Sequence, residues 1–205
     1  AQIRFRRGTP NFSDAELRRL HEEARLVDGE ADIDGGLGLT VNLLPEKEAG
    51  LVGFRAKRHA GLIDVDRRGQ YDVLDFWDPL RVRPGEGLIL DPDEFYILAS
   101  REAVHVPASH AAEMVPYNPL VGEFRVHYAG FFDPGFGAKE AGGLGSRAVL
   151  EVRSHDVPFI LEHGQIIGRL VFERLTDRPA VLYGEGLGSN YQRQGLKLSK
   201  HFKQL

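Results

Sequence analysis

The chain has 205 residues, of which 42% are hydrophobic and 27% charged, and this balance is typical of a folded globular protein. Its formal net charge of -4 provides no overall basic field, which argues against a nucleic acid polymer as partner. Because the chain contains no cysteine, disulfides, thiolate nucleophiles and zinc sites with Cys ligands are excluded.

Length and hydropathy favour one domain that works in the cytoplasm. No apolar run approaches the roughly 18 residues of a membrane span, and residues 1–9 carry three arginines without the apolar segment of a secretion signal. We therefore expect no membrane partner. The predicted domain covers residues 1–205, with an N-terminal arm and helix in residues 1–30 and a lid-like tail in residues 183–205.

The first predicted element is an amphipathic helix over about residues 14–26. Ser13 and Glu16 have the spacing of a capping box, in which each side chain accepts a bond from the other residue's backbone N–H. Leu17, Leu20 and Ala24 follow on one helical face. The sequence therefore predicts a helix that begins just after Ser13.

Beyond this helix the apolar residues follow the two-residue period of half-buried strands. Leu37, Leu39, Val41 and Leu43 alternate with small or polar residues. Further strands are expected in residues 54–59, 71–76, 87–90, 94–99, 122–128, 147–152, 159–161 and 166–175, with a second short helix in residues 107–114. Turn residues separate these ranges. The pattern predicts an all-β sandwich, barrel or jelly roll.

Two acidic residues stand in settings that allow a structural or a chemical role. Asp133 lies in the turn Phe132-Asp133-Pro134-Gly135-Phe136, where an aspartate commonly caps its own turn. Glu151 ends the run Val149-Leu150-Glu151, as on the solvent face of a strand. Alternatively, Glu151 points into a pocket, where it passes protons between water and a base. Each residue alone leaves both interpretations open.

Other residues also allow two interpretations. The tail in residues 183–195 combines glycines with polar donors and Arg193, as in an anion-binding lid, although a frayed polar terminus is the alternative. Trp77 is interpreted as a core anchor, with a subunit interface as the alternative. The histidines show no metal-ligand spacing and are expected to be structural: His105, His110, His127, His155 and His163.

The order of these motifs resembles the dCTP deaminase family of the dUTPase-like superfamily. The matching segments are Phe95-Tyr96-Ile97-Leu98-Ala99-Ser100, the turn around Asp133, Val149-Leu150-Glu151, His163-Gly164-Gln165-Ile166-Ile167-Gly168 and Gly188-Ser189-Asn190-Tyr191-Gln192-Arg193-Gln194-Gly195. The resemblance implies a distorted jelly-roll (β-clip) fold with an N-terminal helix, in homo-trimers or pseudo-oligomers with nucleotide sites between subunits. It also suggests the C-terminal half of a tandem-duplicated member.

What the resemblance implies for function is hydrolytic, zinc-independent deamination of dCTP to dUTP in pyrimidine deoxynucleotide metabolism. Glu151 matches the glutamate that activates water. The matches to nucleotide-binding positions are Asp133 beside the deoxyribose, the backbone of Val149 and Leu150 at the base edge, and Tyr183, Asn190 and Gln194 in the tail. Mg²⁺ is expected on the triphosphate oxygens, and no metal ligand is expected on the protein.

Three features depart from the family pattern. Pro116-Tyr117-Asn118-Pro119-Leu120 replaces a Ser-Ser-x-x-Arg segment that holds phosphates, Asn190 stands where a lysine is common, and residues 137–146 form a longer connection. These departures favour a chain that shares its site with a partner half or subunit. The alternatives are a catalytically degenerate nucleotide-binding or structural half, and a dUTP pyrophosphatase.

Overall fold

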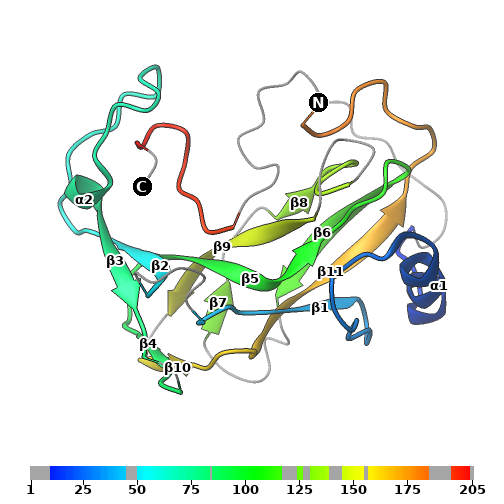
Figure 1. The fold of residues 1–205 in the computed structure, drawn as a ribbon, viewed down its shortest axis with the longest axis horizontal. Helices are drawn as coiled ribbons and strands as arrows, with labels where there is room; N and C mark the ends of the chain where they lie inside the picture. Colours follow the sequence, from blue (N-terminus) through cyan, green and yellow to red (C-terminus); the bar gives the residue numbers. More distant parts are fainter. Residues whose placement is uncertain are drawn as a thin grey trace.

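The structure is a computed structural model. It describes residues 10–44, 50–83, 85–116, 124–126, 130–138, 145–154, 157–184 and 195–203. Within these ranges the chain forms a four-stranded sheet, a five-stranded sheet and a two-stranded ribbon, together with one long and one short helix (Figure 1). The expectation of an all-β fold with an N-terminal helix is confirmed.

Helix α1 (Asp14–Ala24) lies at one end of the molecule, opposite the end formed by the short helix α2 (Val73–Phe76) and strand β3 (Trp77–Arg81) (Figure 1). The predicted capping box is present, since the Ser13 backbone donates to Glu16 Oε2 at 2.9 Å and the Glu16 backbone donates to Ser13 Oγ at 3.4 Å. Leu17 is buried against the strands. The helix ends two residues before the predicted boundary because Arg25 adopts a left-handed conformation with a φ of 49°.

The four-stranded sheet has the order β1 (Leu37–Thr40), β11 (Ile166–Arg174), β6 (His110–Pro116) and β8 (Phe131–Phe132). The helix expected in residues 107–114 is wrong, because most of this range belongs to β6. Strand β6 pairs with β11 over seven residues, from Gly168 opposite Pro116 to Arg174 opposite His110. This tertiary pairing overrides the local helix preference of an alanine-containing segment.

The five-stranded sheet has the order β3 (Trp77–Arg81), β2 (Leu51–Ala56), β5 (Tyr96–Val104), β9 (Ser146–Ser154) and β7 (Phe124–Val126). The strand expected in residues 71–76 is wrong, because Val73–Phe76 forms the short helix α2. Asp72 Oδ1 accepts a hydrogen bond from the Leu74 backbone at 3.0 Å and so caps this turn. The extended backbone begins instead at Trp77.

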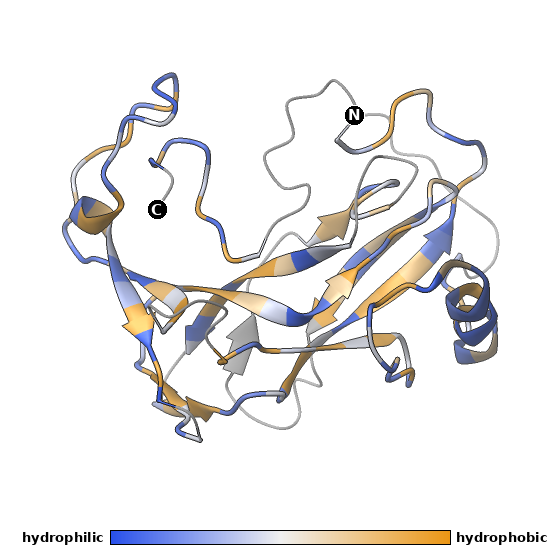
Figure 2. Ribbon diagram, viewed as in Figure 1, coloured by the Kyte–Doolittle hydropathy of each residue, from blue (hydrophilic) through white to orange (hydrophobic). Residues whose placement is uncertain are grey.

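The two large sheets pack face to face over one main core. It contains Leu39 of β1 and Phe172 of β11 from the four-stranded sheet, and Leu98 of β5 and Leu150 of β9 from the five-stranded sheet. The ribbon of β4 (Leu88–Leu90) and β10 (Phe159–Leu161) adds Leu90 and further leucines at the edge of this core. Burial of each such side chain contributes roughly 1.5–3 kcal/mol. Figure 2 shows apolar and polar residues alternating along these strands.

A second apolar group, here called the C-terminal cluster, covers the other face of the five-stranded sheet. Its buried members are Phe54, Val73, Ile97, Leu198 and Phe202. The C-terminal segment, residues 195–203, thus lies over this face and is tied to the loop before α2, where Lys203 N donates to Tyr71 O at 2.9 Å (Figure 1, red). Apolar side chains therefore cover this face of the sheet over β2 and β5.

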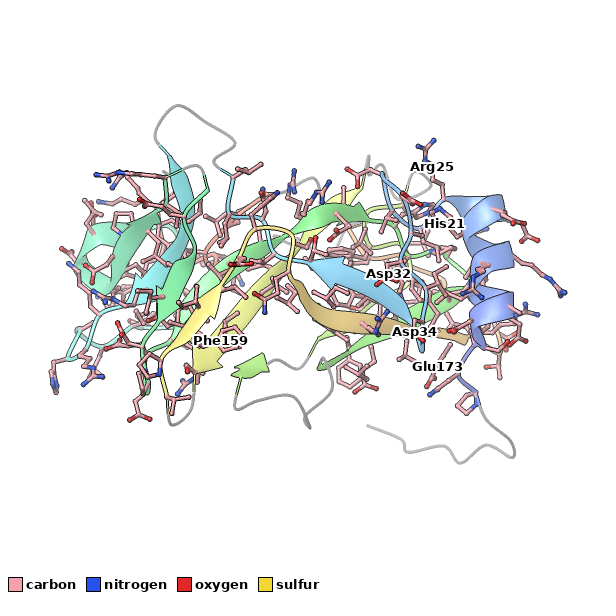
Figure 3. The ribbon with its side chains drawn as sticks, turned by 90° about the horizontal axis from the view of Figure 1, so that it is seen from below. His21, Arg25, Asp32, Asp34, Phe159 and Glu173 are labelled. Atoms are coloured by element: carbon pink, nitrogen blue, oxygen red, sulfur yellow. The ribbon has the colours of Figure 1, made fainter. Side chains whose placement is uncertain are left out.

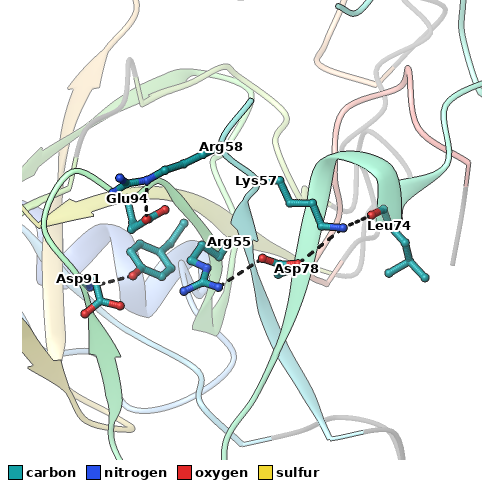
Figure 4. Close-up of polar contacts among 8 residues, drawn as sticks. Arg55, Lys57, Arg58, Leu74, Asp78, Asp91 and Glu94 are labelled. Carbon is teal, nitrogen blue, oxygen red and sulfur yellow. Dashed lines mark hydrogen bonds and ion pairs between the residues drawn. The ribbon is translucent and has the colours of Figure 1, made fainter. Parts of the chain in front are cut away.

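Polar contacts connect β2 with β3 and with the segment just before β5 (Figure 4). Asp78 of β3 accepts from Arg55 of β2 at 3.3 Å, and Arg58 pairs with Glu94 at 2.9 Å. The hydroxyl of Tyr96 accepts from the Asp91 backbone at 2.8 Å, and burial raises the pKa of this phenol. Exposed ion pairs of this kind stabilise a fold by at most about 1 kcal/mol each. The Arg58–Glu94 pair and the Tyr96 bond lie at the start of β5, whereas the Arg55–Asp78 pair joins β2 to β3.

No helix within the described ranges is long and apolar enough to cross a membrane.

Candidate functional site

Glu151 lies in the middle of β9, on the face of the five-stranded sheet that carries the C-terminal cluster. Its neighbours along the strand, Leu150 and Val152, point into the main core, so Glu151 points the opposite way. The side chain is exposed, whereas the pocket interpretation predicted partial burial. Among the described residues its carboxylate has no hydrogen-bond or ion-pair partner. A ligand or a neighbouring subunit would have to supply any further burial.

The surface beside Glu151 is largely apolar. Ile97 of β5 lies directly opposite Glu151 and is buried in the C-terminal cluster. Val149, two residues away on the same face, packs against that cluster as well. Arg153 follows on the other side, with its guanidinium 4.9 Å from the centre of the Phe95 ring. The Glu151 carboxylate therefore lies at the edge of an apolar surface, and the cationic side chain of Arg153 follows on the same face of β9.

Within the described ranges, the backbone of β9 next to Glu151 is paired on one side only. The Ala148 N–H points towards β5, where it donates to Ser100 Oγ at 2.8 Å. Because neighbouring residues of a strand direct their backbone groups to opposite sides, those of Val149 and Glu151 point away from β5, and those of Leu150 point towards it. Among the described residues, β7 covers that open side only from Val152 onward. The backbone groups of Val149 thus have no strand partner on that side in the part of the chain that the structure describes.

Asp133 stands at the start of the predicted turn, which the structure contains. The Phe136 backbone donates to Asp133 O at 3.0 Å, and Gly135 adopts a φ of 92°. The Asp133 side chain is exposed, and within the described ranges it has no hydrogen-bond partner. It does not cap its own turn there, so its carboxylate is available for a ligand.

The beginning of the tail docks onto this turn. Tyr183 N donates to Pro134 O at 2.9 Å, and the Tyr183 ring lies 5.6 Å from the Phe136 ring, centre to centre. The structure thus brings together Asp133 and Tyr183, which are 50 positions apart in the sequence. Asn190 and Gln194, the other two predicted tail contacts, lie outside the described residues.

The Asp133 turn and Glu151 lie at different points along β9. The turn reaches the start of the strand, where Gly145 N donates to Gly137 O at 2.9 Å. Glu151 lies five residues beyond Ser146, which corresponds to about 17 Å of extended backbone.

Sequence reasoning missed one polar residue at this strand. Ser100 lies in β5 and is fully buried, and it bonds to β9 only three residues before Glu151. The available signal was a lone hydroxyl at the end of the apolar run Tyr96-Ile97-Leu98-Ala99. A buried hydroxyl needs a hydrogen-bond partner, so a serine at the end of an apolar strand indicates a bond to a neighbouring segment.

A cavity of about 590 Å³ lies elsewhere, beside the loop after α1, and contains none of the predicted site residues. Of its four carboxylates, those of Asp28, Asp32 and Glu102 have structural partners. Asp28 accepts from the Ala103 backbone at 2.9 Å, and Glu102 accepts from the Thr40 hydroxyl at 2.6 Å. Asp32 and Asp34 both lie near Arg169, at 3.4 and 3.6 Å (Figure 3). Within the described ranges no three His, Asp or Glu side chains are grouped so as to hold a metal ion.

Comparison with known proteins identifies the class to which this fold belongs. Residues 13–202 match the family model described as the 2'-deoxycytidine 5'-triphosphate deaminase (DCD), C-terminal domain. A dCTP deaminase, dUMP-forming, from Halobacterium salinarum is 30% identical over 180 residues, which cover 83% of this chain and 86% of that protein. One of the same name from Beutenbergia cavernae is 34% identical over 150 residues, covering 70% and 74%.

A solved structure supports the same assignment. The crystal structure of 2'-deoxycytidine 5'-triphosphate deaminase from Agrobacterium tumefaciens matches with 58% sequence identity and a TM-score of 0.75. The match covers 84% of this chain and 50% of that one, so this chain spans about half the length of the solved relative. The architecture is the dUTPase-like β fold, and the chain belongs to the dCTP deaminase family.

Proposed function

We propose that this chain contributes to hydrolytic deamination of dCTP, with Glu151 activating water. The observation that carries the proposal is the position of this carboxylate in β9. Glu151 is exposed and has no partner among the described residues. It lies beside an apolar surface and two residues from Val149, whose backbone groups point away from β5 to a side that no described strand covers there. A carboxylate in such a setting can take a proton from water and return it to a leaving group.

The proposed reaction needs two proton movements at Glu151. The carboxylate takes a proton from water as the oxygen attacks C4 of cytosine, and it then delivers a proton to the amino group. The C4–N bond breaks and ammonia leaves, and the proton of the oxygen added at C4 moves to N3, so that the base becomes uracil. Asp133 binds the deoxyribose, the Val149 backbone holds the base edge, and Tyr183, Asn190 and Gln194 contact the nucleotide from the tail. The Leu150 backbone points towards β5 and takes no part in binding.

The triphosphate needs donors beyond those near Glu151. Residues 116–120 lack the Ser and Arg of the family segment, so we propose that a partner half or subunit supplies them in a trimer or pseudo-oligomer. The match of this chain to half of its solved relative supports that arrangement. Mg²⁺ would be held by triphosphate oxygens and water, where it neutralises phosphate charge.

A second candidate is the formation of dUMP in place of dUTP as the released product. It is favoured by the names of the relatives from Halobacterium salinarum and Beutenbergia cavernae, which are dUMP-forming. This reaction adds hydrolysis between the α- and β-phosphates and releases pyrophosphate. The Val149-Leu150-Glu151 motif concerns deamination, which is common to both candidates.

One assay tests these proposals together. The full-length protein in its native assembly is incubated with dCTP and Mg²⁺, and ammonia and nucleotide products are measured. Ammonia with dUTP supports the first candidate, whereas ammonia with dUMP and pyrophosphate supports the second. If no ammonia forms while dCTP still raises the melting temperature, deamination is rejected and a nucleotide-binding role remains.

A further inference from the structure

Strand β5 contains a bulge opposite the part of β9 that leads to Glu151. The two strands pair regularly from Tyr96 opposite Val152 to Ala99 opposite Val149, and pairing resumes at Ala103 opposite Arg147. Three residues of β5, Ser100 to Glu102, therefore face the single residue Ala148. In a bulge of this kind some backbone groups lose their ladder partners.

The side chain of Ser100 replaces the missing ladder partner. Its Oγ accepts from Ala148 N at 2.8 Å and donates to Glu102 O at 2.7 Å. Arg147 Nη1 donates to Ser100 O at 2.9 Å, which ties the same two strands a second time. Ser100 is 0% exposed, so water cannot substitute for these bonds.

The bulge is also anchored to the opposite sheet. The Glu102 carboxylate accepts from the Thr40 backbone at 2.8 Å and from its hydroxyl at 2.6 Å. Thr40 ends β1, so a continuous chain of hydrogen bonds runs from β1 through Glu102 and Ser100 to Ala148 of β9. Bonds that connect three strands in this way hold the bulge in one conformation.

The position of Glu151 depends on this connection. From Arg147 to Glu151, the only described strand that pairs with β9 is β5, and the regular ladder begins next to Ala148. A slip of one residue would turn Glu151 towards the main core and bring Leu150 out in its place. Smaller shifts would still move the carboxylate along the ligand.

We propose that Ser100 is a positioning residue for Glu151. Through Ala148 it holds the register and height of β9, so that the Glu151 carboxylate and the Val149 backbone meet one ligand in a fixed relation. This inference rests on the proposed deamination. If Ser100 positions Glu151, loss of the Ser100 hydroxyl should reduce turnover while the protein remains folded.

The test is Ser100→Ala in the full-length protein, assayed for ammonia release well below its melting temperature. We expect kcat to fall about tenfold or more with little change in KM, because displacement of a catalytic group by less than 1 Å is enough for such a loss. Ser100→Thr, which keeps the hydroxyl, should recover a large part of kcat. Faster hydrogen exchange at the Ala148 amide should accompany the loss in Ser100→Ala.

Ser154→Ala is the matched control. Ser154 is also buried and lies on the same strand, but its hydroxyl donates to Val157 O beyond the end of β9. Ser154→Ala should lower the melting temperature and leave kcat within about twofold of that of the unchanged protein. Near-normal kcat in folded Ser100→Ala, or an equal loss in Ser154→Ala, would overturn the positioning role. An inactive unchanged protein would instead reject the proposed deamination, and the positioning role with it.

Discussion

The backbone N–H of Tyr183 donates to the carbonyl oxygen of Pro134 at 2.9 Å, so the start of the tail is fixed to the turn that carries Asp133. The aromatic contact between Tyr183 and Phe136 adds to this bond. The tail thus enters the site region from a defined point.

Replacement of the Tyr183 ring should weaken the attachment. Loss of the aromatic contact in Tyr183→Ala costs about 1 kcal/mol, which corresponds to roughly a fivefold increase in KM for dCTP. Tyr183→Phe keeps the ring and should retain most of the affinity. Limited proteolysis after residue 184 gives a readout that does not depend on activity. Equal cleavage of both variants and of the unchanged protein would contradict the attachment.

Removal of the charge of Glu151 should abolish turnover without preventing binding. Glu151→Gln keeps the size of the side chain but cannot accept a proton from water, so we expect kcat to fall by about 10²–10⁴-fold. The melting-temperature increase caused by dCTP should remain. Steady-state ammonia release and thermal unfolding with and without dCTP provide the two measurements.

Glu113→Gln is the control for this charge removal. Glu113 is exposed on β6, in the other sheet, so its replacement should leave kcat unchanged. Turnover by Glu151→Gln close to that of Glu113→Gln would remove Glu151 from its proposed role.

The turn before β9 should accept only glycine at position 137. Gly137 has a φ of 63°, and an added Cβ would overlap Val104 O and approach Ser146 N to 2.8 Å. Gly137→Ala should therefore lower the free energy of unfolding by roughly 3 kcal/mol or more. Gly69 has a φ of 64° with no atom within 4 Å of the added Cβ, so Gly69→Ala should cost about 1–2 kcal/mol. Urea denaturation of both variants checks the difference.

The stability of the fold should depend on pH through His110. Burial and the nearby Arg174 lower the pKa of His110 below its ordinary value of 6.5, so the folded state binds this proton less readily than the unfolded chain. The free energy of unfolding should be highest above about pH 6.5 and fall below it, by at most about 1.4 kcal/mol per pH unit for one such group.

His110→Gln should remove this contribution to the slope. The imidazole of His163, whose pKa is lowered by burial and by Arg101, still contributes in that variant, so the slope should decrease and not vanish. Urea denaturation at several pH values between about 5.5 and 7.5 measures this slope of the free energy of unfolding against pH. An unchanged slope in His110→Gln would contradict the prediction.

Local sequence patterns predicted those parts of the fold whose structure is decided locally. The capping box of Ser13 and Glu16 marked the start of α1, and the range 159–161 matched β10 without error. One error occurred where distant pairing decides, and the other where a local helix cap was overlooked. Residues 110–116 extend because β11 lies beside them, and residues 73–76 turn because Asp72 caps them locally, a signal that the apolar pattern of the range obscured.

Sequence motifs supply the candidate residues of the site but not their arrangement. The motifs around Asp133 and Glu151 could be read from the sequence, as could the possible role of Tyr183. Their separation along β9 and the docking of Tyr183 could not, because both depend on contacts between segments far apart in the chain. Ser100 was missed for the same reason, since its importance comes from a bulge that only the pairing of β5 with β9 defines.

The C-terminal cluster gives the protein a built-in optical probe. Trp77 is the only tryptophan, and its ring centre lies 6.1 Å from that of Phe202 in the C-terminal segment. If the segment lifts from the sheet, water reaches the indole and its fluorescence emission shifts to longer wavelength. Movement of the chain end during nucleotide binding can therefore be followed in solution without any label.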